Sequence, residues 1–537
     1  MNNIIWGNIN RRGKIKLLIM IFMVSAGGIL SILPVKCMER MADLAVSYSR
    51  ENVSTIIVLG TVYIVLELIS NASKYYGFYL ADNLQYSITG RIQVSLYEKL
   101  TRIGLLELKA HESNSLANII IEDTAFLSEN MLKPITDLLL MSVTFFCGLY
   151  YMVSISWMLT IMIIPLGIIS SFSAKAIGAK ARSNIVNKRR ASEKLWKTFN
   201  EGIRGIIPLR ISQAEKRYGN QVKKDSESLK NSNVVQSKLE KANTAVVSSL
   251  FMITIGVILL ASCLFVISGK ISVGGMTAVL MYNHMLVDPL VNLIDVQQVI
   301  IKQRVSLKRI GGVMEIAEQK DRPYVRVNSI ETTDLACQIG EITILNKCNI
   351  NIANCEKVAI VGETGCGKTT LANTIAGLIS PTQGKIVYRY NGIINQGVPR
   401  VSYLYQDGYL FDSNIKENIL IANPSLSDEE YHAIIKMCCL EGLASEQIGQ
   451  IGENGEKLSG GERKRIRIAR TLACRDADVY IFDELSTSLD GKTAHEITEN
   501  ILAMLKDKIC IFIEHNLDIA GLMDETIIIN NGAAVVQ

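Results

Sequence analysis

With 537 residues, the chain is longer than one hydrophobic core usually supports, so we expect two or more domains. Its hydrophobic content of 49% and mean hydropathy of +0.24 are high for a soluble enzyme, which indicates membrane spans. The net charge of +5 is too small for this length to indicate a nucleic-acid partner. The 11 cysteines are scattered without a C-x-x-C pair, which argues against a disulfide framework and a zinc site.

Six apolar segments before residue 300 are long enough, or nearly so, to cross a bilayer. They run from Leu17 to Val35, Ser54 to Asn71, Ile135 to Val153, Trp157 to Ser171, Thr244 to Ile267, and Val273 to Ile294. A cleavable signal peptide is the alternative for the first, but that run is long and no A-x-A site follows it. The pattern predicts an all-α membrane domain over residues 1–320, in contact with the lipid bilayer.

The connections between these spans are uneven in length and charge. Long connections follow the second and fourth spans, and the latter carries the basic cluster Lys188, Arg189 and Arg190. The loop after the fifth span has only Lys270. Because positive charge stays in the cytoplasm, both long connections and both termini are expected there, as helices that continue below the membrane. After the sixth span we expect the helix to run on to Pro323.

From residue 325 the pattern changes to short strands that alternate with helices. The stretch VGETGCGKTT fits G-x-x-x-x-G-K-[ST] and lies between a predicted strand and a predicted helix. Its backbone N–H groups can surround a phosphate while a lysine reaches the β/γ oxygens. A glycine-rich turn alone is sometimes only a turn, but the full pattern in this setting favours nucleotide binding. The predicted binding residues are Gly362, Glu363, Thr364, Gly365, Cys366, Gly367, Lys368, Thr369 and Thr370.

Two further predicted parallel strands, ADVYIFDE and KICIFIEH, end in candidate catalytic side chains. Ligands are expected at the carboxyl edge of such a sheet. Thr369 offers a hydroxyl to Mg²⁺, and Asp483 is expected to hold that ion indirectly, through its hydration sphere. Glu484 is placed to polarise an attacking water. His515 is a candidate contact for the γ-phosphate, although a lone histidine after a strand is equally well structural.

The segment LSGGERKRIRIARTL, residues 458–472, resembles the signature motif of the ATP-binding cassette transporters. The other motifs follow in the order of that family: phosphate loop, Tyr405-Gln406-Asp407, signature, Asp483-Glu484, STSLD at residues 486–490, and His515. The resemblance implies ATP and Mg²⁺ as cofactors and catalytic roles for Lys368, Gln406, Glu484 and His515. It also implies that Gln406 is a metal ligand and that the nucleotide is contacted by Gln406, Ser459, Gly460, Gly461, Glu462 and Asp490.

The resemblance covers the whole chain, because six spans with two long cytoplasmic connections are the exporter-type arrangement of this family. It implies a six-helix membrane domain of the type I or type IV exporter fold. A P-loop α/β nucleotide-binding domain with a helical subdomain is expected over residues 325–537. The segment NEGIRGIIPLRISQAEKRYGNQ resembles the second cytoplasmic loop of the family, with its short transverse helix.

A signature motif of this family serves a nucleotide bound on a second cassette, so the chain is expected to be a half-transporter that works as a dimer. A homodimer is favoured. Ile339 stands where the family usually stacks an aromatic residue on adenine, which keeps a heterodimer open. Glu462 replaces the commoner glutamine and adds negative charge near the triphosphate, whereas Cys366 is interpreted as a tolerated filler.

The resemblance implies ATP-driven export of a peptide or amphipathic small molecule across the bacterial cytoplasmic membrane by alternating access. The alternatives are a lipid or drug flippase, an exporter-shaped siderophore importer and a non-transporting sensor. Polar side chains at bilayer depth are candidates for a cargo cavity, although helix–helix hydrogen bonds would explain them equally well. They are Glu67, Asp137, Asn283, His284 and Asp288.

Overall fold

The structure is a computed structural model that describes residues 10–47, 52–110, 116–117, 119–319, 322–340, 342–445, 449–530 and 532–536. The chain divides into two compact units. The helical unit comprises residues 1–98 and 114–315, and the α/β unit comprises residues 99–113 and 316–537.

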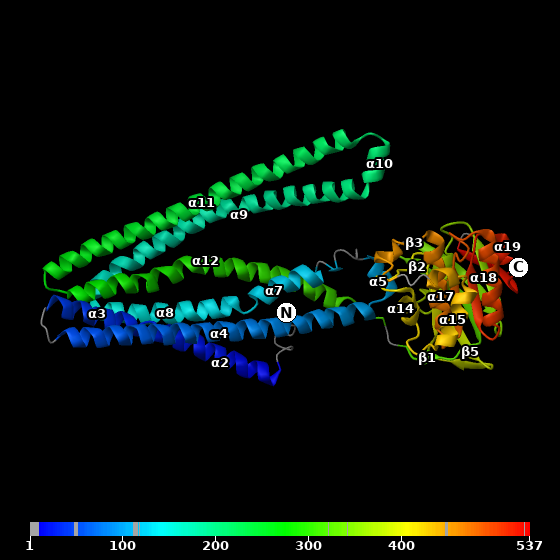
Figure 1. The fold of residues 1–537 in the computed structure, drawn as a ribbon, viewed down its shortest axis with the longest axis horizontal. Helices are drawn as coiled ribbons and strands as arrows, with labels where there is room; N and C mark the ends of the chain where they lie inside the picture. The colour runs from blue at the N-terminus through cyan, green and yellow to red at the C-terminus, as the bar shows by residue number, and fades with distance from the viewer. Residues whose placement is uncertain are drawn as a thin grey trace. The chain divides into compact units, whose positions relative to one another are not determined.

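Long helices build the first unit, and in Figure 1 α9 and α11 run side by side and are joined by the short helix α10. Five of the six predicted spans each lie within one helix, the first is divided between α2 and α3, and the predicted transverse helix is α10. The elements are α2 (Arg11–Leu30), α3 (Leu33–Val46), α4 (Asn52–Arg102), the π-helix η1 (Ile119–Asp123), α7 (Thr124–Asn130), α8 (Lys133–Ile155), α9 (Trp157–Arg204), α10 (Ile206–Ile211), α11 (Glu215–Ile267) and α12 (Val273–Glu315).

The first predicted span is interrupted within its length, and the predicted end of the last long helix is wrong. The first span is interrupted by a turn at residues 31–32, and α3 then begins with Pro34 in its first turn. Proline lacks an N–H and is tolerated at the start of a helix, so Pro34 was the signal for this break. The last long helix ends at Glu315 rather than at Pro323, because the chain becomes extended and Glu318 forms a β-bridge with Ile103.

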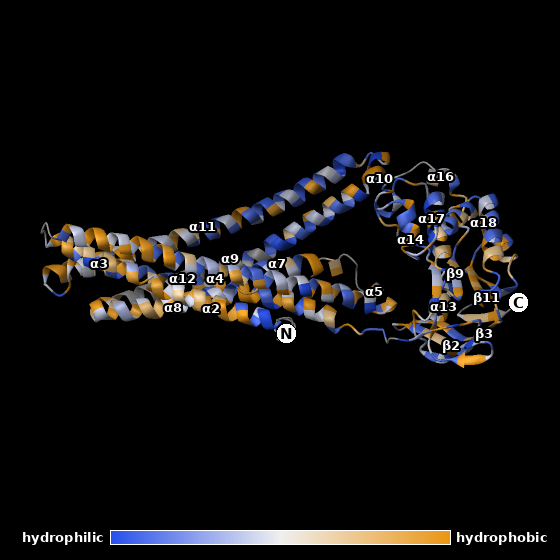
Figure 2. Ribbon diagram, turned by 60° about the horizontal axis from the view of Figure 1, so that its bottom comes forward, coloured by the Kyte–Doolittle hydropathy of each residue, from blue (hydrophilic) through white to orange (hydrophobic). Residues whose placement is uncertain are grey.

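The helical unit carries its apolar residues at one end. Four helical stretches in the described part of the chain are apolar enough to cross a membrane: Arg11–Val46, Asn52–Arg102, Ile119–Ile155 and Glu215–Ile267. In Figure 2 hydrophobic residues gather toward α3, whereas α9 and α11 are mostly hydrophilic toward α10. The predicted spans in α9 and α12 are helical, but they are not among these four apolar stretches. In α12 the polar residues Asn283, His284 and Asp288 lower the mean hydropathy.

Small residues allow α2 and α4 to approach closely. A Cβ on Gly27 would lie 2.7 Å from Lys74 Cγ, and a Cβ on Gly77 would lie 2.7 Å from Val24 Cγ2. The Ser70 hydroxyl donates across the same contact to the carbonyl oxygen of Gly27, at 2.9 Å. Small residues and interhelical hydrogen bonds are typical of helix contacts inside a bilayer.

A six-stranded sheet forms the centre of the α/β unit, with the order β12-β11-β4-β10-β9-β8. All neighbouring pairs are parallel except β11 and β12. A four-stranded antiparallel sheet has the order β3-β2-β5-β6. The strands are β1 (Tyr324–Val325), β2 (Ser329–Ile339), β3 (Ile342–Ile352), β4 (Lys357–Gly362), β5 (Gln383–Tyr390), β6 (Ile393–Asn395), β7 (Val398–Pro399), β8 (Val401–Leu404), β9 (Val479–Asp483), β10 (Ile509–Ile513), β11 (Glu525–Asn530) and β12 (Ala533–Val536).

The central strands are buried on both faces, as a parallel sheet covered by helices requires. Phe482 and Phe512 stack at 4.8 Å in one core, and Ile481 and Ile511 point into a second core. The three strands predicted from sequence are confirmed as β4, β9 and β10. The helices are α13 (Lys368–Ile375), α14 (Ile415–Leu420), α15 (Asp428–Met437), α16 (Glu441–Ser445), α17 (Gly460–Ala473), α18 (Gly491–Met504) and α19 (Leu517–Ala520), besides α5 (Leu105–Ala110) and the 3₁₀ turn η2 (Glu453–Gly455).

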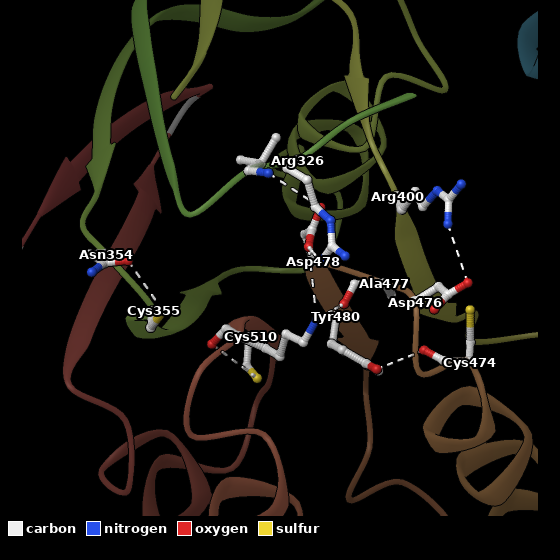
Figure 3. A network of polar contacts seen from close by, with 12 residues as sticks. Arg326, Asn354, Cys355, Arg400, Cys474, Asp476, Ala477, Asp478, Tyr480 and Cys510 are labelled. Carbon is white, nitrogen blue, oxygen red and sulfur yellow. Dashed lines mark hydrogen bonds and ion pairs between the residues drawn. The ribbon is translucent and has the colours of Figure 1, made fainter. Parts of the chain in front are cut away.

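Asp478 fastens the start of β9 to the rest of the unit (Figure 3). Its buried carboxylate accepts hydrogen bonds from the backbone N–H of Val327 at 3.2 Å and from the Arg326 guanidinium at 3.3 Å. The Lys508 ammonium lies 3.8 Å from the same carboxylate. Nearby, the Tyr480 hydroxyl donates to the carbonyl oxygen of Cys474 at 2.7 Å. These contacts fix the register of the strand that ends in Asp483.

Candidate active site

Glycines shape the loop between β4 and α13. Gly362, Gly365 and Gly367 have φ values of +153°, +86° and +108°, a region that favours glycine. A Cβ on Gly362 would lie 2.4 Å from the carbonyl oxygen of Ile529, and one on Gly367 would lie 2.9 Å from Leu345 Cδ2. Local packing therefore requires glycine at positions 362 and 367, and the positive φ favours it at 365.

Lys368 begins α13 and turns back over this loop. Its ammonium donates to the carbonyl oxygens of Gly362 at 2.8 Å and Glu363 at 3.0 Å. Glu363, Thr364 and Gly365 are exposed at the tip of the loop. The cation thus lies at the N-terminus of a helix, where backbone N–H groups and the helix dipole favour an anion.

Asp483 ends β9 directly beside the loop. The Thr369 hydroxyl donates to Asp483 Oδ2 at 3.1 Å. Burial raises the pKa of the Asp483 carboxyl, while the hydrogen bond from Thr369 opposes that shift. A hydroxyl and a carboxylate are hard oxygen ligands of the kind that Mg²⁺ prefers, so this pair fits the predicted metal site. Gln406, the third residue predicted to bind Mg²⁺, donates a hydrogen bond to the Glu484 carboxylate.

Glu484 is the point at which the predicted catalytic side chains meet. Its Oε2 accepts from Gln406 Nε2 at 2.8 Å and from the Thr487 hydroxyl at 3.3 Å. Its Oε1 lies 3.7 Å from His515 Nε2. The backbone of Glu484 is left-handed, with φ +52°, and its N–H donates to the carbonyl oxygen of Ile513. A strained backbone of this kind in a non-glycine residue is common at functional sites.

Ser459 and Glu462 form a capping box at the start of α17. The carboxylate of Glu462 accepts from the backbone N–H of Ser459 at 2.7 Å and from its hydroxyl at 2.8 Å. These hydrogen bonds lower the pKa of Glu462. Ideal Cβ atoms on Gly460 and Gly461 would approach Ser488, with 3.1 Å from Gly461 to the Ser488 carbonyl oxygen. The signature residues therefore pack against the segment that follows Glu484.

Asp490 has a local structural contact. It is the N-cap of α18 and accepts from the backbone N–H of Thr493 at 3.0 Å, a bond that lowers its pKa. No hydrogen bond among the described residues joins Ser459, Gly460 or Gly461 to the phosphate loop. The structure thus gathers one set of predicted residues around Glu484. Of the signature residues, Gly460 lines one cavity together with Gln406 and Glu484.

Two buried charged residues that support the site were missed by sequence reasoning. Lys464 donates to the carbonyl oxygen of Asp483 at 3.2 Å, and burial lowers its pKa. Glu514 accepts from the backbone N–H of Ser486 at 3.0 Å and from its hydroxyl at 2.6 Å. A signal existed for Glu514, which follows a fully apolar strand directly and precedes His515.

Within the helical unit, most of the predicted cavity residues do line one cavity, of about 450 Å³. Asn283 does not: it is fully buried elsewhere on α12. Lys74 lines the same cavity and was not singled out from the sequence. The predicted residues that line it are Glu67, Asp137, His284 and Asp288.

Comparison with known proteins decides the family. Residues 17–290 match the family described as ABC transporter transmembrane region, and residues 345–487 match the family described as ABC transporter. The chain belongs to the ABC transporter family. A nucleotide-binding domain of this family binds ATP, and the multi-pass helical unit makes this ABC transporter a membrane protein.

The ABC transporter matches an experimental structure over nearly its whole length. "Structure of a bacterial Atm1-family ABC exporter with ATP bound" superposes with a TM-score of 0.80, covering 98% of this chain and 94% of that one at 18% identity. This likeness concerns the fold, and it confirms the predicted helical membrane domain joined to an α/β nucleotide-binding domain.

Curated relatives differ in their named activities. "Lactococcin-G-processing and transport ATP-binding protein LagD" of Lactococcus lactis subsp. lactis is 29% identical over 62% of this chain and 50% of its own. "ATP-dependent lipid A-core flippase" of Syntrophus aciditrophicus is 24% identical over 96% and 88%. "Transport/processing ATP-binding protein ComA" of Streptococcus pneumoniae is 24% identical over 89% and 68%. The chain spans half or less of the length of several of the curated relatives it matches.

Proposed function

We propose that the chain is one half of an ATP-driven exporter that moves a peptide or another amphipathic small molecule across the bacterial cytoplasmic membrane. The main support for this proposal is that Gln406 and His515 both contact Glu484, beside the phosphate loop. The same chain also contains a membrane unit. The relative LagD is named for the processing and transport of lactococcin G, and this name supports a peptide as the cargo class.

Lys368 and Thr369 would bind the triphosphate. The Lys368 ammonium would leave the carbonyl oxygens of Gly362 and Glu363 for the β and γ oxygens of ATP, which carry more negative charge. Thr369 and Asp483 would hold Mg²⁺, which when bound neutralises charge that develops on the phosphates. The N–H groups at the start of α13 complete the cradle.

Glu484 would activate the water. With its carboxylate fixed by Gln406 and Thr487, it accepts a proton while the water oxygen bonds to the γ-phosphorus. The bond between that phosphorus and the bridging oxygen of ADP breaks as the new bond forms. His515, on the other side of Glu484, is placed to donate to the γ-phosphate oxygens.

Replacement of Glu484 by glutamine tests this proposal. Glu484→Gln keeps the shape and the contact with Gln406 but loses the base, so turnover is expected to fall by about 100-fold or more. ATP binding should persist, and ATP should accumulate on the protein unhydrolysed. Glu429→Gln, an exposed glutamate on α15, is the matched control and should hydrolyse normally. Normal turnover by Glu484→Gln would contradict the assigned base.

A lipid flippase is the second candidate, because the lipid A-core flippase aligns over 96% of this chain. The two candidates differ in what they move in sealed vesicles that contain the protein. ATP-dependent accumulation of a labelled peptide inside inverted vesicles supports peptide export. ATP-dependent movement of a labelled lipid between leaflets, without peptide uptake, supports the flippase.

A further inference from the structure

The cavity in the helical unit has walls of two kinds. It lies among α3, α4, α8 and α12, and all of its lining residues belong to the helical unit. One part of the wall is flexible and apolar: Met38, Met141, Met281 and Met285. Methionine side chains adapt to irregular apolar shapes, so this wall suits the body of an apolar or amphipathic ligand.

The other part of the wall is ionisable. Three helices contribute its charges: Glu67 and Lys74 lie two turns apart on α4, and Asp137 lies on α8. His284 and Asp288 lie one turn apart on α12, with Nδ1 and Oδ2 separated by 3.8 Å. Three carboxylates against one ammonium leave the wall negative whether or not His284 is protonated.

Two of these carboxylates interact with a lysine only at longer range, Glu67 with Lys74 and Asp137 with Lys133. Among the described residues, neither Glu67 nor Asp137 has a basic nitrogen within 4 Å of its carboxylate. The contact of Glu67 is the neutral amide of Asn71, at 3.2 Å. A carboxylate at bilayer depth without a close ion pair is costly, and such residues often mark a ligand or ion pathway.

We propose that this cavity binds cargo through a cationic group, an amine or a guanidinium, attached to an apolar body. The inference rests on the proposed export function and narrows its cargo to basic or amine-bearing molecules. The cation would lie between Glu67 and Asp137, and the body would contact the methionines. A cavity of about 450 Å³ holds a small molecule or a few side chains of a peptide rather than a folded domain.

Lys74 allows the proposal to be tested with two substitutions that should change the affinity for a cation in opposite directions. Its ammonium lies on the same wall as Glu67 and lowers the affinity for a cation by repulsion. Removing a carboxylate should therefore weaken cation binding, whereas removing the ammonium should strengthen it. A general loss of folding would not produce opposite effects from two neighbouring substitutions on α4.

Two ions of matched shape serve as probes. Tetraphenylphosphonium and tetraphenylborate both carry four phenyl rings around a central atom but have opposite charge. ATPase stimulation is measured with the full-length protein in lipid nanodiscs, with empty nanodiscs as the blank for binding to lipid. Stimulation by the cation, with little or none by the anion, is the expected result.

Substitutions in the cavity test whether the cation acts there. Glu67→Gln and Asp137→Asn should each raise the half-saturating concentration of the cation by roughly threefold to tenfold, and Lys74→Gln should lower it by a similar factor. Glu129→Gln, an exposed glutamate on α7, is the control and should not change it. Equal stimulation by both ions, no response to either, preference for the anion, or carboxylate variants without effect would overturn the inference.

The proposed function fails on a different observation. If the basal ATPase activity, without either ion, is absent or is unchanged in Glu484→Gln, the ATPase assignment is wrong. If that activity depends on Glu484 but shows no preference for the cation, only the cargo inference is wrong.

Discussion

At the scale of single residues, Glu462 has two opposing effects. Its carboxylate caps the signature helix through Ser459, and this contact stabilises the helix start. The same negative charge stands at the N-terminus that a partner-bound triphosphate would approach. The spacing of Ser459 and Glu462 matches the S-x-x-E pattern of a capping box, so a local signal for the cap was present in the sequence.

Glu462→Gln should separate these effects. The glutamine oxygen can still accept from the Ser459 N–H, so the cap survives while the charge is removed. We expect the ATP concentration for half-maximal hydrolysis to fall by roughly twofold to fivefold. Glu462→Ala also removes the half of the capping box that its carboxylate supplies, while the Ser459 hydroxyl still accepts from the backbone N–H of residue 462, so helix stability should fall by less than about 1 kcal/mol. An unchanged ATP dependence in Glu462→Gln would show that Glu462 does not compete with the triphosphate.

Ile339 permits a second prediction at this scale. It is the last residue of β2 and is half-buried opposite Ile342. If the base lies over this position, Ile339→Tyr should strengthen ATP binding by roughly twofold to tenfold, because an aromatic face stacks on adenine. Gln338→Tyr points to the other face of the strand and is the control. Equal affinities for Ile339→Tyr and the unsubstituted protein would place adenine elsewhere.

At the scale of elements, the ends of β4, β9 and β10 could be predicted because each carries a local signal. Apolar runs followed at once by Gly362, by Asp483 or by the pair Glu514-His515 indicate buried strands that end at a ligand edge. The antiparallel sheet could not be predicted in the same way. Its strands alternate between polar and apolar residues, but β2 contains register shifts between Thr332 and Gln338 that only the partner strands determine.

The anchoring of β9 by Asp478 gives an element-scale prediction. Asp478→Ala leaves the buried N–H of Val327 and the Arg326 guanidinium without this acceptor, so the α/β unit should lose about 1 to 3 kcal/mol of stability. Thermal loss of ATP-analogue binding measures this effect. Asp476→Ala removes only an exposed ion pair with Arg400 and should cost less than about 1 kcal/mol. Equal midpoints for both variants would contradict the anchoring role.

At the scale of the whole molecule, contacts between residues far apart in the sequence could not be predicted from it. Lys99 pairs with Glu318 at 3.0 Å across 219 positions, and residues 99–113 belong to the α/β unit. No local pattern encodes such a contact. The motif order, by contrast, is a property of the linear sequence, and it sufficed to predict the family and the joined helical and α/β architecture.

The same motifs lead to a prediction about assembly. Lys368 and Ser459 have no hydrogen bond to each other in the described chain, and each serves a different half of the proposed composite site. Two copies related by twofold symmetry would place Lys368 of one copy and Ser459 of the other around each ATP. Each ATP would then need both chains.

Mixing two inactive variants tests this arrangement. Lys368→Ala removes the phosphate-binding ammonium, and Ser459→Arg blocks the signature, so each homodimer should be inactive. In a mixed dimer one composite site carries both defects and the other carries none. Co-expression at equal levels should therefore restore up to about a quarter of the normal sites, because half of the dimers are mixed and each has one intact site. If each site were complete within one chain, every chain in the mixture would still carry one defect, and no activity would return.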